Sequence, residues 1–199
     1  MLDHVFTDAI GSLRDALESA LLERQAFEER FQSDILLGDL TWATSYSLPG
    51  EGVPARVQAN ITLDWPTWSQ TAYRLWYISE PVADPPHIVI SVAFRVQRLR
   101  FIPDPRQVLN VLPAVSAKVG SSSLDRSAPK VETVFDITLK HQEHAIEVVF
   151  EGLYELGESA LADGAQLDEH FGAMGGWVAS TLIKLGDLKL NFLDPEPTE

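Results

Sequence analysis

The chain has 199 residues, 45% of them hydrophobic and 22% charged, which predicts one globular domain rather than two. Its 29 acidic and 15 basic side chains give a formal net charge of −14, and this negative field argues against nucleic acid and anionic membrane surfaces as partners. The absence of cysteine excludes disulfides, thiolate nucleophiles and cysteine-ligated metals.

The ends and the hydropathy of the chain bear on its location. No basic region precedes an apolar run at the N-terminus, so we expect no secretory signal. No apolar run reaches the roughly 18 residues that a membrane-spanning helix needs. We therefore expect a cytoplasmic protein that does not bind membranes.

The N-terminal segment has helical periodicity, with apolar residues recurring at alternating steps of four and three. The pattern predicts one long helix from about Asp3 to Gln32, although Gly11 and Ser12 interrupt it and a shorter helix could start at Ser12. Because the repeat is short, packing on the protein's own sheet is favoured over a coiled coil. The predicted face comprises Phe6, Ile10, Leu13, Leu17, Ala20, Arg24, Phe27 and Phe31.

Apolar and polar residues then alternate in three segments, 40–48, 56–64 and 87–97. Such alternation predicts antiparallel strands with one face on the core and the other largely polar. Pro66, between Trp65 and Trp68, predicts a turn because proline fixes its own φ and lacks a donor for a strand ladder.

Residues 71–78 predict a further strand, in which both faces are apolar. Since an unpaired arginine is costly to bury, the face that carries Arg74 is assigned outward. This assignment places Tyr73, Leu75 and Tyr77 inward, and Arg74, Trp76 and Ile78 outward.

The C-terminal half predicts two helices and a hairpin. Asp104 as a cap and Pro105 in the first turn predict a short helix that continues to Leu112. The serine-rich segment 120–130 is expected to be a mobile linker. Residues 134–140 and 145–156 predict a hairpin with His141–His144 at its tip and with Phe135, Ile137 and Leu139 facing the core beside Ile146, Val148 and Phe150. A last helix is predicted from about Leu167 to Leu185.

Together these elements predict an α+β fold: a long N-terminal helix, an antiparallel β-meander, a short helix, a β-hairpin and a C-terminal helix packed on one face of the sheet. We expect a single domain over residues 1–193 and an acidic, flexible tail over residues 194–199.

The predicted outer face of the sheet is the leading candidate for a contact surface. An exposed tryptophan beside isoleucine, ringed by arginines and amides, has the composition of a recognition surface, and the alternative is that the C-terminal helix covers it. The middle helix offers a second apolar surface. The partner-binding candidates are Trp76, Arg74, Ile78, Arg95, Val108 and Leu112.

The sequence shows no catalytic motif. His141 and His144 have the spacing of a helical chelate but fall at a predicted hairpin tip, so we expect no metal site and no cofactor. Arg95, Arg98, Arg100 and Arg106 could clamp a phosphate or a carboxylate, but pairing with the protein's own acids is the favoured explanation.

The order of the predicted elements resembles that of the type III secretion chaperone-like α+β fold. The resemblance implies a small acidic homodimer that binds protein segments, and it carries over no functional position because no residue motif supports it. We therefore predict a non-enzymatic adaptor or chaperone-like module, dimeric, whose partner is another protein or a second copy of itself. The alternative is a small-ligand protein or an enzyme with a pocket between a curved sheet and a helix, lined by Trp42, Tyr73 and Tyr77.

Overall fold

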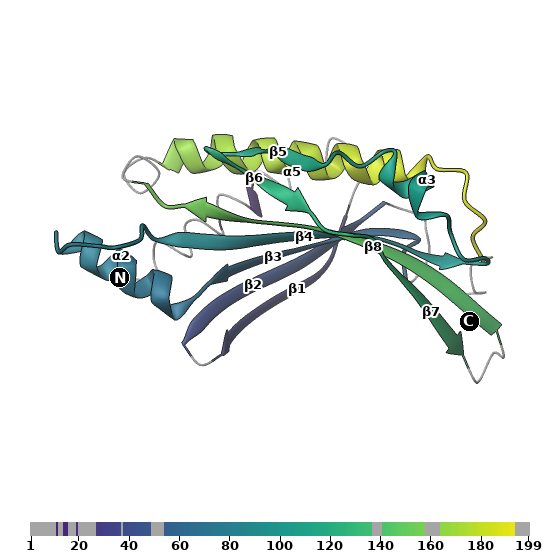
Figure 1. Ribbon diagram of the computed structural model, residues 1–199, viewed down its shortest axis with the longest axis horizontal. Helices are drawn as coiled ribbons and strands as arrows, with labels where there is room; N and C mark the ends of the chain where they lie inside the picture. Colours follow the sequence, from purple (N-terminus) through teal and green to yellow (C-terminus); the bar gives the residue numbers. More distant parts are fainter. Residues whose placement is uncertain are drawn as a thin grey trace.

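The computed structural model describes residues 27–36, 38–48, 54–136, 141–157 and 164–193, together with Gly11, Arg14, Asp15 and Ser19. These residues form an antiparallel eight-stranded sheet with one long helix lying across one of its faces (Figure 1). The strand order is β1-β2-β3-β4-β8-β6-β5. Strand β7 lies outside this order: it pairs with the first part of β8, whereas β6 pairs with a later part of the same strand. The architecture is α+β.

The strands are β1 (Phe27–Leu36), β2 (Asp39–Ser47), β3 (Val57–Trp65), β4 (His87–Leu99), β5 (Val115–Val119), β6 (Ser122–Arg126), β7 (Lys130–Asp136) and β8 (His141–Glu155). The helices are α2 (Thr67–Tyr77), α3 (Pro105–Leu109) and α5 (Gly164–Gly186).

The core lies between the sheet and α5. Strands β3 and β4 alternate strictly between buried and half-buried residues along most of their length, so that one face of each packs inward. The inward stripe of α5, which consists of Phe171, Met174, Val178, Leu182 and Leu185, is fully buried. At its centre the Trp177 ring meets Phe94 and Phe150 edge-on, with centroids 5.4 and 5.0 Å away. The helix therefore covers the apolar face of the sheet and leaves the polar face outside.

The predicted N-terminal helix from Asp3 to Gln32 is wrong at its C-terminal end, because Phe27–Leu36 is strand β1. This strand pairs with β2 in nine register positions, interrupted by one irregularity between Glu28 and Arg30. Gly11, Arg14, Asp15 and Ser19 are helical, and the rest of the segment before Phe27 lies outside the described residues. Pairing with β2 outweighs the local helical period in this part of the chain.

The predicted strand over residues 71–78 is also wrong, since Thr67–Tyr77 is helix α2. Its buried residues Ser69, Gln70, Ala72 and Tyr73 follow helical spacing, not a period of two. Pro66 is the N-cap residue of this helix, a position at which the backbone is extended. The structure therefore contains a helix between β3 and β4, and the predicted uninterrupted meander is corrected.

Long-range hydrogen bonds hold α2 in place. The side-chain amide of Gln70 donates to the carbonyl oxygens of Gly38 (2.8 Å) and Trp65 (2.9 Å). The Ser69 hydroxyl donates to the carbonyl of His87 (2.6 Å) and accepts from its N–H (2.6 Å). These bonds tie the helix to the starts of β2 and β4, contacts that no local pattern could indicate.

The hairpin and the linker also differ from expectation. Strand β8 begins at His141, so His141–His144 belongs to a strand paired with β7 and not to a turn. Phe135 is exposed instead of facing the core, whereas Ile146, Val148 and Phe150 are buried as predicted. The expected mobile linker contains β6, which pairs with β5 and β8. The predicted positions of Ile137 and Leu139, and the predicted tail 194–199, lie outside the described residues.

The chaperone-like resemblance rested on an element order that the structure does not have. A strand occupies the end of the predicted first helix, and α2 interrupts the meander. The resemblance therefore supports no further statement about this fold.

Candidate functional site

Three of the predicted partner-binding residues, Arg74, Trp76 and Ile78, lie at the C-terminal end of α2 and not on the sheet. Arg74 and Ile78 are exposed, Ile78 with 63% of its surface. Trp76 is half-buried against the core and stacks on Tyr73, with ring centroids 5.8 Å apart. The structure thus brings the three side chains to one helix end, but Trp76 is not a free indole on the outer face of the sheet.

An aromatic series connects this helix end to the core. Trp65 is fully buried and meets Tyr73 edge-on at 5.7 Å, and Tyr73 in turn lies 6.3 Å from the exposed ring of Tyr77. Burial, followed by the neighbouring Tyr77, raises the pKa of Tyr73. The dense tryptophan segment is therefore mostly core that ends in an exposed aromatic tip.

The structure places the three residues of the alternative ligand pocket, Trp42, Tyr73 and Tyr77, at different depths. Trp42 is fully buried on β2, Tyr73 is 8% exposed, and Tyr77 is 58% exposed on the surface of α2. None of the three lines the pocket described below.

Val108 and Leu112, predicted as contacts on the middle helix, are 1% and 4% exposed. Both point into the core, so a partner cannot reach them without unfolding this region. The start of the helix is built as expected, since the Asp104 carboxylate accepts a hydrogen bond from the N–H of Arg106 (3.0 Å) and Pro105 occupies the first turn. The helix ends at Leu109, however, and not at Leu112 as predicted.

Arg95 lies on the outer face of the sheet, as predicted, but it is engaged by the protein's own acids. Its guanidinium lies 2.8 Å from the Glu132 carboxylate on β7 and 3.5 Å from that of Glu147 on β8. Lys130 approaches Glu132 to 2.6 Å, and its hydrogen bond, followed by that of Arg95, lowers the pKa of Glu132. This cluster neutralises its own charges and leaves little for an external anion.

Amides extend this cluster across the sheet. The Arg95 Nε donates to Gln97 (3.1 Å), whose own side-chain amide lies 3.4 Å from the Gln58 oxygen. Gln58 and Ser45 both donate to the Asn60 oxygen, at 2.9 and 2.7 Å. Because these polar groups satisfy one another, the outer face is a hydrogen-bonded surface and not an apolar contact site.

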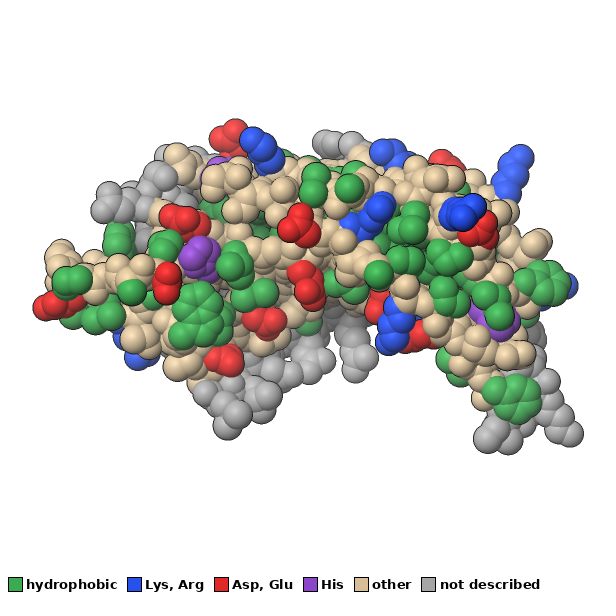
Figure 2. Space-filling model, in the orientation of Figure 1, with side chains coloured by type: hydrophobic (Ala, Val, Ile, Leu, Met, Phe, Trp, Pro, Cys, Tyr) green, Lys and Arg blue, Asp and Glu red, His purple; other side chains and the backbone are tan. Residues whose placement is uncertain are grey.

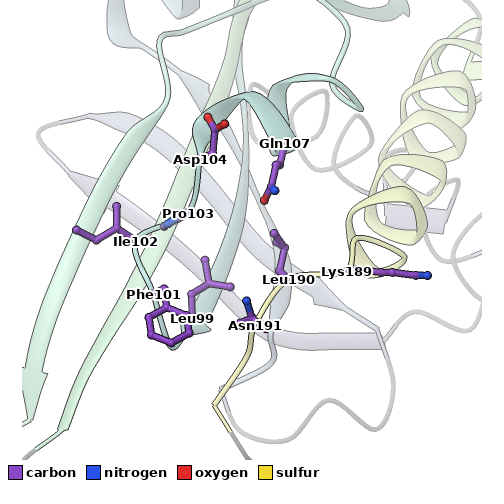
Figure 3. Close-up of a pocket in the computed structure, with 9 residues that line it drawn as sticks. All are labelled: Leu99, Phe101, Ile102, Pro103, Asp104, Gln107, Lys189, Leu190 and Asn191. Atoms are coloured by element: carbon purple, nitrogen blue, oxygen red, sulfur yellow. The ribbon is translucent and has the colours of Figure 1, made fainter.

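A pocket of about 210 Å³ lies where β4 ends and α3 begins (Figure 3). Figure 3 shows Gln107 and Leu190 directed toward one another across it, whereas Ile102 and Lys189 point away. Its walls come from the β4–α3 connection and from the segment that follows α5. The lining residues are Leu99, Phe101, Ile102, Pro103, Asp104, Gln107, Lys189, Leu190 and Asn191.

A kink in β4 and the C-terminal segment together build this pocket. Arg98 has a φ of 59°, in the left-handed region, and the register between β4 and β8 shifts between Val96 and Leu99. Beyond the kink, the N–H of Arg100 donates to Asn191 (2.8 Å) and the N–H of Leu193 donates to Arg98 (2.7 Å). The segment after α5 therefore closes one side of the pocket as a short added strand.

Phe101 and Ile102, beside this pocket, are 62% and 67% exposed. Figure 2 shows hydrophobic side chains gathered over this end of the molecule, where Figure 1 places α3 and the ends of β4, β7 and β8. This pair was not among the predicted contact residues. The sequence does contain a signal for an exposed apolar site here. Two bulky apolar residues stand between an alternating strand and the Pro-Asp-Pro run, where the strand has already left the core.

Two of the histidines, His144 and His170, make structural contacts. His144 is 7% exposed on β8, and its Nδ1 lies 2.8 Å from the hydroxyl of Thr133. The Tyr154 hydroxyl lies 2.9 Å from Nδ1 of His170, and burial raises the pKa of Tyr154 to about 12. The side chain of His141 lies outside the described residues. Among the side chains that the structure does describe, no group of three or more His, Asp and Glu residues is arranged to hold a metal ion.

Two further findings bear on the identity of the protein. Within the described part of the chain, no helix has the length and hydropathy needed to cross a membrane. Comparisons of the chain with protein-family models, with curated proteins and with solved structures give no match.

Proposed function

We propose that this protein is a non-enzymatic protein-binding module, and that Phe101, Ile102 and the adjoining pocket form its contact surface. The single observation behind this proposal is the exposure of these two side chains, 62% and 67%, beside a hollow of about 210 Å³. Large apolar side chains next to a pocket are the arrangement that concentrates binding free energy in protein interfaces.

The size of the pocket favours a protein side chain over a free metabolite. Pockets for small molecules usually measure about 300–1,000 Å³. A hollow of about 210 Å³ has room for a single side chain of a partner, and the exposed Phe101 and Ile102 offer an apolar contact beside it. Covering Phe101 and Ile102 at the same time would contribute about 3–6 kcal/mol before the cost of association, at about 1.5–3 kcal/mol for each side chain.

Charged groups frame this surface. Lys189 and Asp104 both line the pocket, so that opposite charges stand near its mouth. We expect the partner to supply an extended segment in which polar or charged residues flank an apolar anchor, since polar rims around apolar centres are common in such interfaces.

The exposed end of α2 is a second contact surface within the same proposal. Tyr77 and Ile78 are 58% and 63% exposed there, beside Arg74. Tyrosine and arginine are enriched among residues that dominate binding. Figure 1 places α2 at the opposite end of the long axis from α3, so one partner segment cannot cover both surfaces unless it is long.

A peptide-display selection tests the proposal without a known partner. Random peptides selected against the wild-type chain should share one large apolar residue, and the double variant Phe101→Ser/Ile102→Ser should weaken their binding at least about tenfold. Val115→Ser removes a 46%-exposed side chain on β5 and is the matched control, expected to leave binding unchanged.

Two results would contradict the pocket as the contact surface. One is a selection that yields no binders. The other is a set of peptides that bind Phe101→Ser/Ile102→Ser normally and lose affinity for Tyr77→Ser/Ile78→Ser, which would assign binding to α2.

The small-ligand alternative has its own test. A thermal-shift screen with lipids, sugars and nucleotides would raise the melting temperature if one of them bound the folded chain, by mass action. We expect no shift from any of these compounds. We also propose a cytoplasmic location, which cell fractionation tests.

A further inference from the structure

We infer that the free edge of β7 pairs with the same edge of a second copy of the chain, so that two β7 strands run antiparallel across a twofold axis at Thr133. This inference rests on the proposed function only in taking a protein chain as the partner. It uses Lys130–Asp136, which do not line the pocket beside Phe101.

Strand β7 is an edge within the described sheet. It pairs with β8 through seven consecutive positions without a register shift, and no described strand pairs with its other side. Natural edge strands are usually protected by proline, a bulge, outward lysines or a covering helix. β7 has no proline and no bulge, and its one lysine stands at its first position, where it is paired with Glu132.

The exposed side chains of β7 are mainly apolar. Val131, Val134 and Phe135 are 39%, 47% and 60% exposed. By contrast, β5, at one end of the main strand order, packs along α5 (Figure 1). An edge strand that carries exposed apolar side chains, has an unbroken register and meets no further strand among the described residues is the kind that pairs with another chain.

Geometry limits how two β7 strands can meet. Partners across an antiparallel pair point to the same face, and a twofold axis perpendicular to the sheet preserves the face. One residue of the strand must therefore face its own copy. The central choices that keep most of the strand paired are Glu132, Thr133 and Val134.

Charge selects Thr133 among these three. Centring on Glu132 would place two copies of that carboxylate face to face, and centring on Val134 would place position 132 opposite position 136, both acidic. Centring on Thr133 places Lys130 opposite position 136, an aspartate, and Val131 opposite Phe135. Glu132 then faces Val134, and its charge is already balanced by the guanidinium of Arg95. The strand is self-complementary in this register alone.

This pairing would also determine where the exposed α2 ends of the two copies lie. Figure 1 places β7 and α2 at opposite ends of the long axis, so joining two copies at β7 leaves both α2 ends at the outer extremes of the dimer. A partner with two binding segments would then gain from both copies through effective concentration.

Sedimentation velocity over a range of concentrations tests the inference on the full chain. The wild type should be dimeric at micromolar concentration. Phe135→Lys places a lysine against Val131 of the other copy, so the dissociation constant of the dimer should rise at least about tenfold. Val115→Lys, at an exposed position of β5 away from β7, is the matched control and should stay dimeric. Melting curves establish that each variant is folded, which is expected because both side chains are exposed.

Charge exchange tests the register. Lys130→Asp alone would place acids against acids, and Asp136→Lys alone would place lysines against lysines, so each variant should be mainly monomeric. An equimolar mixture should form heterodimers, because both ends of the interface then carry opposite charges.

A wild-type monomer at every concentration, or a dimer that Phe135→Lys does not weaken, would overturn the inference. A mixture that fails to associate would overturn the register at Thr133. If Phe101→Ser/Ile102→Ser loses peptide binding but keeps the mass of a dimer in sedimentation, the proposed dimer is unaffected. The two proposals can therefore fail separately.

Discussion

The carboxylate of Asp39, at the start of β2, accepts hydrogen bonds from the backbone N–H of Thr67 (2.6 Å) and from its hydroxyl (2.7 Å). Thr67 is the first residue of α2, and the N-cap residue Pro66 makes no side-chain capping bond. A residue from another strand therefore supplies the cap that the local sequence lacks. This contact fixes the start of a helix that the sequence pattern had suggested to be a strand.

Removal of this cap should destabilise the protein in a pH-dependent way. Hydrogen bonds from Thr67 lower the pKa of Asp39 from its ordinary value of 3.8. A lowered pKa means that the stabilisation is fully present above pH 3.8 and is lost as the pH falls through the folded-state value. Asp39→Ala should therefore melt below the wild type at pH 7, and the difference should shrink as the pH drops below 3.8. Differential scanning calorimetry of both proteins measures this, and a difference independent of pH would exclude the charged cap.

Gly120 should be intolerant of a side chain. Its φ is +65°, and an added Cβ would lie 3.0 Å from the Tyr154 ring and 3.2 Å from Nδ1 of His170. Gly120→Ala should cost at least about 1–2 kcal/mol of unfolding free energy from the left-handed backbone alone. Gly176→Ala on α5 is the control, because nothing lies within 4 Å of its added Cβ and the change should stabilise the helix by up to about 1 kcal/mol. Urea unfolding measures the change in unfolding free energy for both variants. Equal changes would contradict the close approach of Gly120 to Tyr154 and His170.

Tyr154 should weaken the fold at alkaline pH. Its pKa is raised to about 12 by burial, above the ordinary value of 10.0, so between these values the folded state retains a proton that the unfolded state has lost. Stability should fall as the pH rises through this interval. Tyr154→Phe loses the contact with His170 at pH 7 but is free of this alkaline penalty. The gap in melting temperature between the two proteins should therefore narrow above pH 10, and a constant gap would show that Tyr154 ionises normally.

Two of the predicted contact residues should behave in opposite ways. Leu112 is 4% exposed, so Leu112→Ala should cost about 2–5 kcal/mol of unfolding free energy through lost burial and a cavity. Ile78 is 63% exposed, so Ile78→Ala should change stability by less than about 0.5 kcal/mol. Chemical denaturation measures both. A small loss at Leu112 would mean that the segment following α3 is not anchored in the core.

The parts of the fold that were predicted correctly are those in which one period operates without competition. Strands β3 and β4 alternate cleanly because a single face meets the core, and α5 has a regular apolar stripe for the same reason. The start of α3 was also readable, since Asp104 and Pro105 act on the backbone next to them. In each case the physical cause lies within a few residues of its effect.

The segments that were predicted wrongly satisfy more than one pattern. Residues 71–78 alternate, but Ala72 and Tyr73 also follow Ser69 and Gln70 at a helical spacing of three. Hydrogen bonds from Gln70 to Gly38 and from Thr67 to Asp39 decide between the two patterns. At Phe27–Leu36, pairing with β2 outweighs a helical period.

The sequence by itself determined the acidic charge, the absence of thiol chemistry, the polar and apolar faces of the central strands and the long C-terminal helix, because composition and short-range periodicity are local properties. Only the tertiary structure decided the pocket at the end of β4 and the exposed edge of β7. The pocket requires Leu99 to pair with Phe192, and the edge depends on which strand stands beside β8. Both depend on contacts between distant residues, whose energies no local pattern contains.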